Sequence, residues 1–370
     1  MPGSNLTVGI EFDENVTTRR RRSGQPYSLD WVRVHKQTKV MNFRPFLRLL
    51  AGRFLQSVAT LWLVTVLFFF MIELMPGDFA IASATKSTTE QMMEATRFRL
   101  GLYASAPVRY VQWLFGLLSG DLGTSWWMKS PIASLLAERL WHSAWLVAWA
   151  TALAVPFAIG AALTAVARRG GFFDRCSATT AVAAMSVPDF FVAYILMYLL
   201  AVYFDVFPAF TFFALDIPFL ERLHATGLPI LSLAAVTVTP MFRLTRAALL
   251  NVIDEDYIQM AELKGVGPWR ILFRHALPNV IGPIANAIVL VIANLFFGLV
   301  IIETIFSYPG LGFLLVKATL LHDVPLVQAC ALITAAVYIA LNFLADVAGI
   351  IANPRLRDRV LCSSAPIRRE

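Results

Sequence analysis

Residues 280–306, VIGPIANAIVLVIANLFFGLVIIETIF, form a long and predominantly apolar run. A helix of about 20 apolar residues is long enough to cross a hydrocarbon core of about 30 Å. A helix on the surface of a soluble protein would keep a polar stripe along one side, and this run largely lacks one. We therefore expect residues 280–306 to span a membrane.

Similar runs recur along the chain. Of its 370 residues 58% are hydrophobic and only 15% are charged, whereas an average soluble domain carries about 25% charged residues. The charges gather between the apolar runs. The sequence therefore predicts an all-α polytopic membrane protein with six transmembrane helices, the other five of which are expected at residues 54–75, 143–167, 178–204, 228–249 and 326–352.

The distribution of positive charge predicts the orientation of these helices. Most of the 31 Lys and Arg residues fall in the N-terminal tail, in residues 168–177 and 243–279, and after residue 352. Short cytoplasmic segments of membrane proteins are rich in Lys and Arg, so we expect both termini in the cytoplasm. The same rule explains the net charge of +7 without a nucleic-acid partner. The three cysteines and five histidines have no spacing typical of a metal site.

These patterns divide the chain into five parts. The polar N-terminal tail contains the run Arg19–Arg22, too far from the first apolar stretch for a twin-arginine signal, and Met41 is an alternative start. The outer segment predicts one helix at 88–100 and another with Trp113, Leu114 and Leu117 on one face. The expected parts are a cytoplasmic tail (1–45), the first transmembrane helix (46–75), an external amphipathic segment (76–137), a core of five helices (138–352) with a cytoplasmic hairpin at 250–278, and a cytoplasmic C-terminal tail (353–370).

The hairpin lies just before the opening run, within LLNVIDEDYIQMAELKGVGPWRILFRHALPN at residues 249–279. Gly265 and Gly267 supply a stop after a first helix, Pro268 can begin a second, and Pro278 is expected to end it. Such a hairpin either packs on its own bundle or docks in a groove of another protein. The apolar stripe expected on the first helix consists of Leu249, Val252, Ile253, Tyr257, Met260 and Leu263.

This hairpin resembles the signature loop of the permeases of binding-protein-dependent ABC importers, in particular the oligopeptide and dipeptide branch. The general pattern is Glu-Ala-Ala, three residues, Gly, nine residues, Ile, one residue and Leu-Pro. The chain departs from it at Gln259, Met260 and His275, but the form typical of the peptide branch is closer. The matching positions are Asp256-Tyr257, Ala261, Lys264-Gly265, Arg274-His275-Ala276-Leu277 and Pro278.

Further stretches resemble the same branch, so that the resemblance covers about residues 45–357. It implies a type I ABC transporter permease of the bacterial inner membrane that moves peptides or peptide-like solutes by alternating access. The stretches are ELMPGD at 73–78, GDLGTS at 120–125, ETIFSYPGLG at 303–312, and Asn342 and Asp346 with NPR at 353–355.

The resemblance also implies partners. These are a homologous second permease, one or two ABC ATPase subunits, an extracytoplasmic solute-binding protein and membrane lipid. Because the chain has no G-x-x-x-x-G-K-[ST] loop, we expect it to be no enzyme and to bind no cofactor, with ATP and Mg used by the ATPase subunits. The hairpin would be the coupling loop, and the residues expected at the ATPase are Asp256, Tyr257, Gln259, Met260, Ala261, Lys264, Gly265, Arg274, Leu277 and Pro278.

Polar residues inside expected spans are candidates for the translocation path, because such residues are costly in a membrane. One hypothesis is that Asp189 faces the path and favours a cationic group such as a peptide amino terminus; the alternative is an acid paired with a neighbouring helix or solvated. Asn286 and Asn294 either line the path or form interhelical hydrogen bonds. Pro188, which directly precedes Asp189, can bend or interrupt the expected span.

Two other functional classes compete with an ABC permease. An ion-driven secondary transporter would show inverted repeats and carboxylates on several spans, and a non-transporting scaffold would leave the hairpin without a partner. The substrate stays open, because members of the branch import dipeptides, oligopeptides, nickel chelates, peptide antibiotics and some oligosaccharides.

Overall fold

The computed structural model describes residues 43–74, 104–211 and 217–352. Within these ranges the regular structure is helical, apart from one isolated bridge between Thr124 and Pro131. Five helices are long and apolar enough to cross a membrane, or six if the bent pair α6 and α7 is one span. The expected all-helical, multi-span architecture is thus confirmed, while the expected helix at 88–100 and most of both tails lie outside the described residues.

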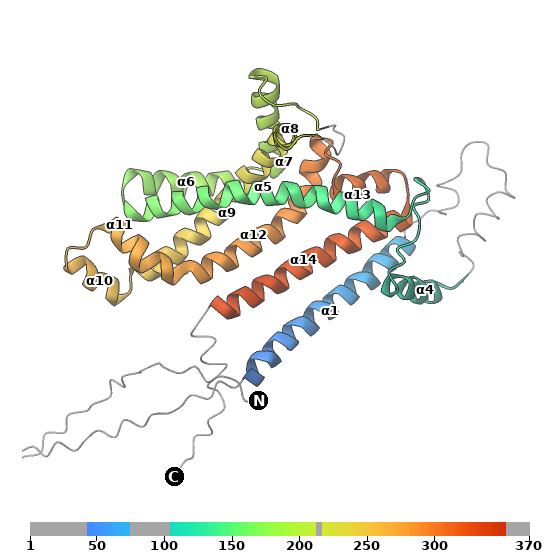
Figure 1. The fold of residues 1–370 in the computed structure, drawn as a ribbon, viewed down its shortest axis with the longest axis horizontal. Helices are drawn as coiled ribbons and strands as arrows, with labels where there is room; N and C mark the ends of the chain where they lie inside the picture. The colour runs from blue at the N-terminus through green and yellow to red at the C-terminus, as the bar shows by residue number, and fades with distance from the viewer. Residues whose placement is uncertain (1–42, 75–103, 212–216, 353–370) are drawn as a thin grey trace, which may run out of the picture. The chain divides into compact units, whose positions relative to one another are not determined.

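Long helices packed along one another form the bundle (Figure 1). The helix α5 (Ile132–Ala167) packs along α9 (Gly227–Ile253), and α12 (Leu277–Ile305) contacts α9 as well as α14 (Val324–Ala352). The first helix, α1 (Phe43–Glu73), lies along α14. At one end of the bundle lie α10 (Asp256–Leu263) and α11 (Pro268–Ile271), and at the opposite end lie α4 (Ala106–Leu118) and α13 (Leu311–Leu320).

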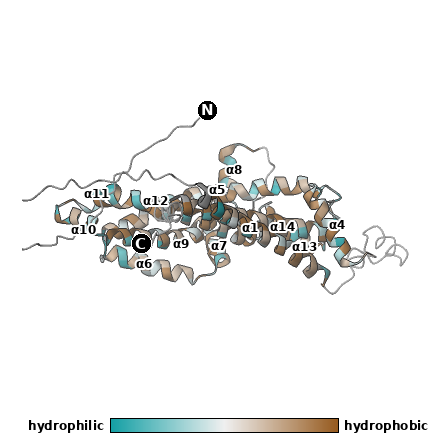
Figure 2. Ribbon diagram, turned by 90° about the horizontal axis from the view of Figure 1, so that it is seen from below, coloured by the Kyte–Doolittle hydropathy of each residue, from teal (hydrophilic) through white to brown (hydrophobic). Residues whose placement is uncertain are grey.

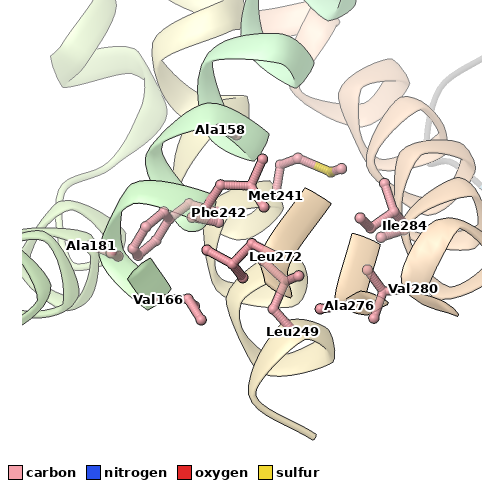
Figure 3. Close-up of a cluster of buried hydrophobic side chains, with 14 of the residues drawn as sticks. Ala158, Val166, Ala181, Met241, Phe242, Leu249, Leu272, Ala276, Val280 and Ile284 are labelled. Carbon is pink, nitrogen blue, oxygen red and sulfur yellow. The ribbon is translucent and has the colours of Figure 1, made fainter. Parts of the chain in front are cut away.

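A buried apolar cluster ties the hairpin to the bundle (Figure 3). Leu249 near the end of α9 and Leu272 after α11 are buried in it together with Val166 of α5. Ala158 and Ala162 of α5 are fully buried in the same cluster, and such small residues let helices approach closely in a membrane. The two ends of the hairpin are therefore buried in the same apolar cluster.

The continuous span expected at 178–204 is wrong. The chain forms α6 (Phe172–Met185) and then α7 (Asp189–Met197), and the pair is bent by 102°. Pro188 caps α7, and proline disfavours helical geometry at the residue before it, so the break follows from its position. A π-helical turn, Tyr198–Tyr203, continues α7.

The surface of the bundle is largely apolar. Many residues of the long helices are hydrophobic, whereas hydrophilic residues are more frequent around α10 and α11 (Figure 2). The side chains of Phe190, Tyr194 and Tyr198 are exposed along α7 and the turn after it. Lipid or a partner helix is the natural surrounding of such a surface, because lipid tails impose no cost on exposed apolar groups.

The helix α4 lies against the C-terminal half of α1. Arg109 forms a salt bridge with Glu73, and the hydroxyls of Tyr110 and Thr65 are 3.0 Å apart. Trp113 of α4 lies with its ring 5.9 Å from that of Phe69, and it is half-buried. The amphipathic helix expected around this residue is therefore present.

A buried carboxylate links the end of α12 to the start of α13. Glu303, near the end of α12, is completely buried. It accepts hydrogen bonds from the backbone N–H groups of Gly312 (2.7 Å) and Phe313 (3.1 Å) and from the Ser143 hydroxyl (2.6 Å). These N–H groups open α13, and an acidic group is favourable at a helix N-terminus. A side chain of one helix thus caps another.

Candidate functional site

The hairpin begins with a break that the sequence pattern did not predict. The helix α9 ends at Ile253, and Glu255 has extended backbone angles (φ −76°, ψ 144°) before α10 starts at Asp256. The expected single helix from Leu249 to Leu263 is therefore wrong, since its two halves belong to different helices. The acidic residues Asp254 and Glu255 lie at the break rather than in the first turn.

Gly265 ends α10 as expected. Its φ is +76°, a conformation that costs other residues more than glycine. The N–H groups of Gly265 and Val266 donate to the carbonyls of Glu262 (2.8 Å) and Ala261 (3.2 Å). This pair of bonds is the Schellman pattern, which satisfies the free carbonyls of a helix end.

The expected end of the second helix at Pro278 is wrong. The chain passes from α11 through a π-helical turn, Leu272–Ala276, directly into α12, whose first turn contains Leu277 and Pro278. In this wider turn the N–H of Leu277 bonds to the carbonyl of Leu272. A π-turn changes the backbone bonds just where a proline ring would crowd a regular helix, so the hairpin is continuous with the span.

The break changes which residues of α10 face the protein. Ile258 is fully buried, whereas Tyr257, Met260 and Leu263 expose 45%, 57% and 83% of their surface. The predicted apolar stripe therefore does not pack on the bundle along α10. Instead, this helix is anchored by Ile258, and it presents apolar side chains outward.

Polar contacts hold α10 against its neighbours. The Asn279 amide donates to the Tyr257 hydroxyl (2.8 Å), and the Arg169 guanidinium donates to the Asp254 carboxylate (2.7 Å). The hydrogen bond and the charge of Asp254 raise the pKa of Arg169. A cleft of about 790 Å³ lies between the turn after α5 and the hairpin, and Glu262 is among the residues that line it.

The structure brings the expected coupling residues together at one end of the bundle. Ala261 and Leu277 are half-buried and the others are exposed. Pro278 lies in the first turn of α12 and so belongs to the base of the hairpin rather than to its tip. The exposed residues are Asp256, Tyr257, Gln259, Met260, Lys264, Gly265, Arg274 and Pro278.

Two of the three residues expected in a translocation path share a cavity. Asp189 of α7 and Asn294 of α12 line a cavity of about 110 Å³ that also borders α9. Asn286 does not line it. The side chain of Asn286 lies beside Gly349 of α14, where an added Cβ would meet its Oδ1 at 3.4 Å.

Comparison with known families agrees with this architecture. The family described as binding-protein-dependent transport system inner membrane component matches residues 154–358, more than half of the chain. The chain belongs to this family. A model of the N-terminal part of the same transport components matches residues 46–139. The permease is therefore an inner membrane component with multiple spans, a transport protein rather than an enzyme, and works with ATPase and binding-protein partners.

Individual relatives match most of this chain over nearly their own whole length. A probable peptide ABC transporter permease of Sinorhizobium fredii is 33% identical over 305 residues, which are 82% of this chain and 97% of the relative. A glutathione transport system permease of Pectobacterium atrosepticum is 33% identical over 310 residues, again 82% and 97%.

Sequence reasoning missed three buried carboxylates that shape the permease. Glu303 caps α13, Asp174 pairs with Arg246 of α9 at 2.8 Å, and Asp323 accepts bonds from the backbone N–H groups of Trp126 (3.2 Å) and Trp127 (3.1 Å). The only available signal was an acid at or near an apolar run. That signal does not distinguish a helix cap from a residue of the path.

Proposed function

We propose that the permease is one of two homologous transmembrane subunits of a type I ABC importer. It has six spans, with α6 and α7 counted as one, and both termini in the cytoplasm. The excess of Lys and Arg in the hairpin and the tails supports this orientation. The hairpin then faces the ATPase subunits, which use ATP and Mg.

One observation carries the proposal. The tip of the hairpin exposes Tyr257, Met260 and Leu263, while its two ends are fixed in the bundle by Leu249 and Leu272, both almost completely buried. Exposed apolar groups on a small helix are suited to a groove on another protein. A helix that docks outside and is anchored inside transmits a movement of its partner to the spans.

Transport by alternating access follows from such a connection. A partner shifts an equilibrium between inward-facing and outward-facing states only if it binds the two states with different affinity. The ATPase subunits change their separation as they bind and hydrolyse ATP. The docked α10 helices would therefore be closer together in one state than in the other.

Peptides or peptide-like solutes are the proposed cargo. The two relatives described above are named as permeases for peptide and for glutathione, and glutathione is itself a tripeptide. A solute that enters from the outer face would first be held by the extracytoplasmic binding protein.

The decisive experiment is a charge placed on the exposed tip. Leu263→Asp is expected to reduce ATP-driven peptide uptake by the complete transporter in liposomes more than tenfold and to prevent copurification of the ATPase. Leu220→Asp is the matched control, since Leu220 of α8 (Phe219–Ala225) is 77% exposed and lies on a different helix. Full uptake by the Leu263 variant, or uptake that follows a proton gradient without ATP, would contradict the proposal.

A further inference from the structure

The cavity shared by α7, α9 and α12 lies where the third span is broken. Asp189 is the first residue of α7, directly after the 102° bend. Broken helices within a membrane frequently mark binding sites, because irregular backbone is tolerated there only inside protein or beside water. The cavity has about 110 Å³, enough for an ammonium group and a few water molecules.

The lining of the cavity contains one acidic group and no basic one. Apart from Asp189, Asn294 and Thr237, the lining residues are apolar or glycine. The Thr237 hydroxyl donates to the carbonyl of Leu233 (2.6 Å), so its oxygen still offers lone pairs toward a donor. A carboxylate, an amide oxygen and a hydroxyl oxygen together form a set of acceptors for a cation that donates hydrogen bonds.

The two most polar groups of the cavity have no partner among the described residues. Within residues 43–74, 104–211 and 217–352, neither a hydrogen bond nor an ion pair connects the Asp189 carboxylate or the Asn294 amide to another side chain. Asp174, by contrast, forms a salt bridge with Arg246. Asp189 and Asn294 are both exposed on the surface of this chain, so they can be reached from outside it. An unpaired acid within a membrane span is costly and is expected to meet a cation during function.

Glycine leaves room for that cation. A Cβ added at Gly298 of α12 would lie 3.7 Å from Oδ2 of Asp189, so a larger side chain at this position would fill the space in front of the carboxylate. The glycine has no positive φ. Its small size, rather than its backbone conformation, therefore keeps the carboxylate accessible.

We propose that the cavity is a contact point for the protonated amino group of the solute on its way through the membrane. The Asp189 carboxylate accepts from the ammonium group, the Asn294 and Thr237 oxygens supply further acceptors, and Gly298 leaves space for it. This inference rests on the proposed transport of peptides. It adds that the permease itself, besides its binding protein, distinguishes a free amino terminus from a neutral one.

The test compares two forms of one peptide. The complete transporter with its binding protein, in liposomes, is given a dipeptide with a free amino terminus and its N-acetylated form. Asp189→Asn is expected to lower uptake of the free amine about tenfold, the effect of losing a hydrogen bond to a charged group, and to change uptake of the acetylated form less than twofold. Asp189→Glu should retain at least half of the free-amine uptake.

Further variants separate a contact site from a structural role. Gly298→Leu is expected to reduce free-amine uptake as Asp189→Asn does. Asp205→Asn, at an exposed acid outside the cavity, should change nothing. The proposal is overturned if Asp189→Asn and Asp189→Glu reduce uptake of the free amine equally, or if Asp189→Asn reduces uptake of both peptides equally. It is also overturned if the Asp189→Asn complex no longer assembles, as judged by size-exclusion chromatography.

Failure of the proposed function gives a different result. If the wild-type complex takes up neither peptide with ATP, peptide transport itself is refuted, and the assignment of the cavity falls with it. If the wild-type complex takes up the free peptide and Asp189→Asn does so equally well, only the assignment of the cavity is refuted.

Discussion

Arg169, in the turn after α5, donates a hydrogen bond of 2.7 Å to Asp254, the residue at which α9 gives way to the hairpin. The pair joins two segments that are 85 positions apart in the sequence. Both side chains are about half exposed, at 52% and 61%. The contact therefore lies at the entrance of α10, where it can fix the direction of the helix without being part of the buried core.

Arg169→Ala is expected to reduce coupling more than stability. An exposed ion pair contributes at most about 1 kcal/mol, so the melting temperature of the purified permease should hardly change. A less firmly held α10 should lower the amount of peptide moved per ATP hydrolysed, which parallel uptake and ATPase assays measure. Because salt screens exposed charges, high ionic strength should impair the wild type but not the variant. Equal transport per ATP in both proteins would contradict this role.

Gly265→Ala and Gly267→Ala form a matched pair on the same turn. A Cβ meets no atom within 4 Å at either position, but Gly265 has a φ of +76° and Gly267 a φ of −66°. Alanine at Gly265 should therefore cost about 1–2 kcal/mol of local strain, displace the end of α10 and uncouple uptake from ATP hydrolysis. Alanine at Gly267 should transport normally. Normal coupling in both variants would show that the Schellman turn is not needed.

Glu303→Gln is expected to release α13 from the bundle. The carboxylate accepts hydrogen bonds from the backbone N–H groups of Gly312 and Phe313. The neutral amide of Gln accepts these bonds less well, so the free energy of unfolding should fall by about 1–3 kcal/mol. Gly310→Ala should be at least as harmful, because its Cβ would overlap with the Glu303 carboxylate. The measurement is thermal unfolding in detergent.

Gly160→Ala is the control for these two changes. Gly160 lies inside α5 with no atom near its Cβ position, so alanine should leave stability unchanged or raise it by up to about 1 kcal/mol. If Gly310→Ala unfolds at the same temperature as Gly160→Ala, the capping role of the carboxylate is refuted.

Two arginine variants should differ because of burial. Arg246→Ala leaves Asp174, which exposes only 7% of its side chain, without its salt bridge, and an uncompensated buried charge costs about 3–5 kcal/mol. Arg53→Ala leaves Asp346, which is 42% exposed, and should cost at most about 1 kcal/mol. Thermal unfolding of both proteins checks this order. Similar values for the two would mean that the Asp174 pair is effectively solvated.

The position of the hairpin along the chain was predictable, but its internal geometry was not. Gly265 was correctly expected to end a helix, because the residue just after a helix end often has a left-handed backbone conformation that favours glycine. The break at Asp254 and Glu255 has no such local signal. Acidic residues such as these also fit the first turn of a longer helix. The separation of α9 from α10 depends on tertiary packing, in which Leu249 before the break and Ile258 after it are both buried.

The candidate path shows the same division. Asp189 and Asn294 were singled out because polar groups are rare in apolar spans, and the structure places both at one cavity. Asn286, selected by the same reasoning, lies beside Gly349 instead. Glu303 was not singled out, although it is the one acidic residue of α12 and is completely buried. A polar residue in an apolar span stands out in the sequence, but the sequence does not indicate which residue it contacts.

By itself the sequence determined that this protein is a bundle of membrane helices, because the length of each apolar run must match the thickness of the bilayer. It also located the hairpin between two spans, because charge and glycine interrupt the apolar pattern there. The tertiary structure alone decided where the third span breaks into two, which carboxylates are used as caps or ion pairs, and which one lines a cavity without a partner among the described residues. These properties depend on contacts between residues distant in the chain, and local periodicity carries no information about such contacts.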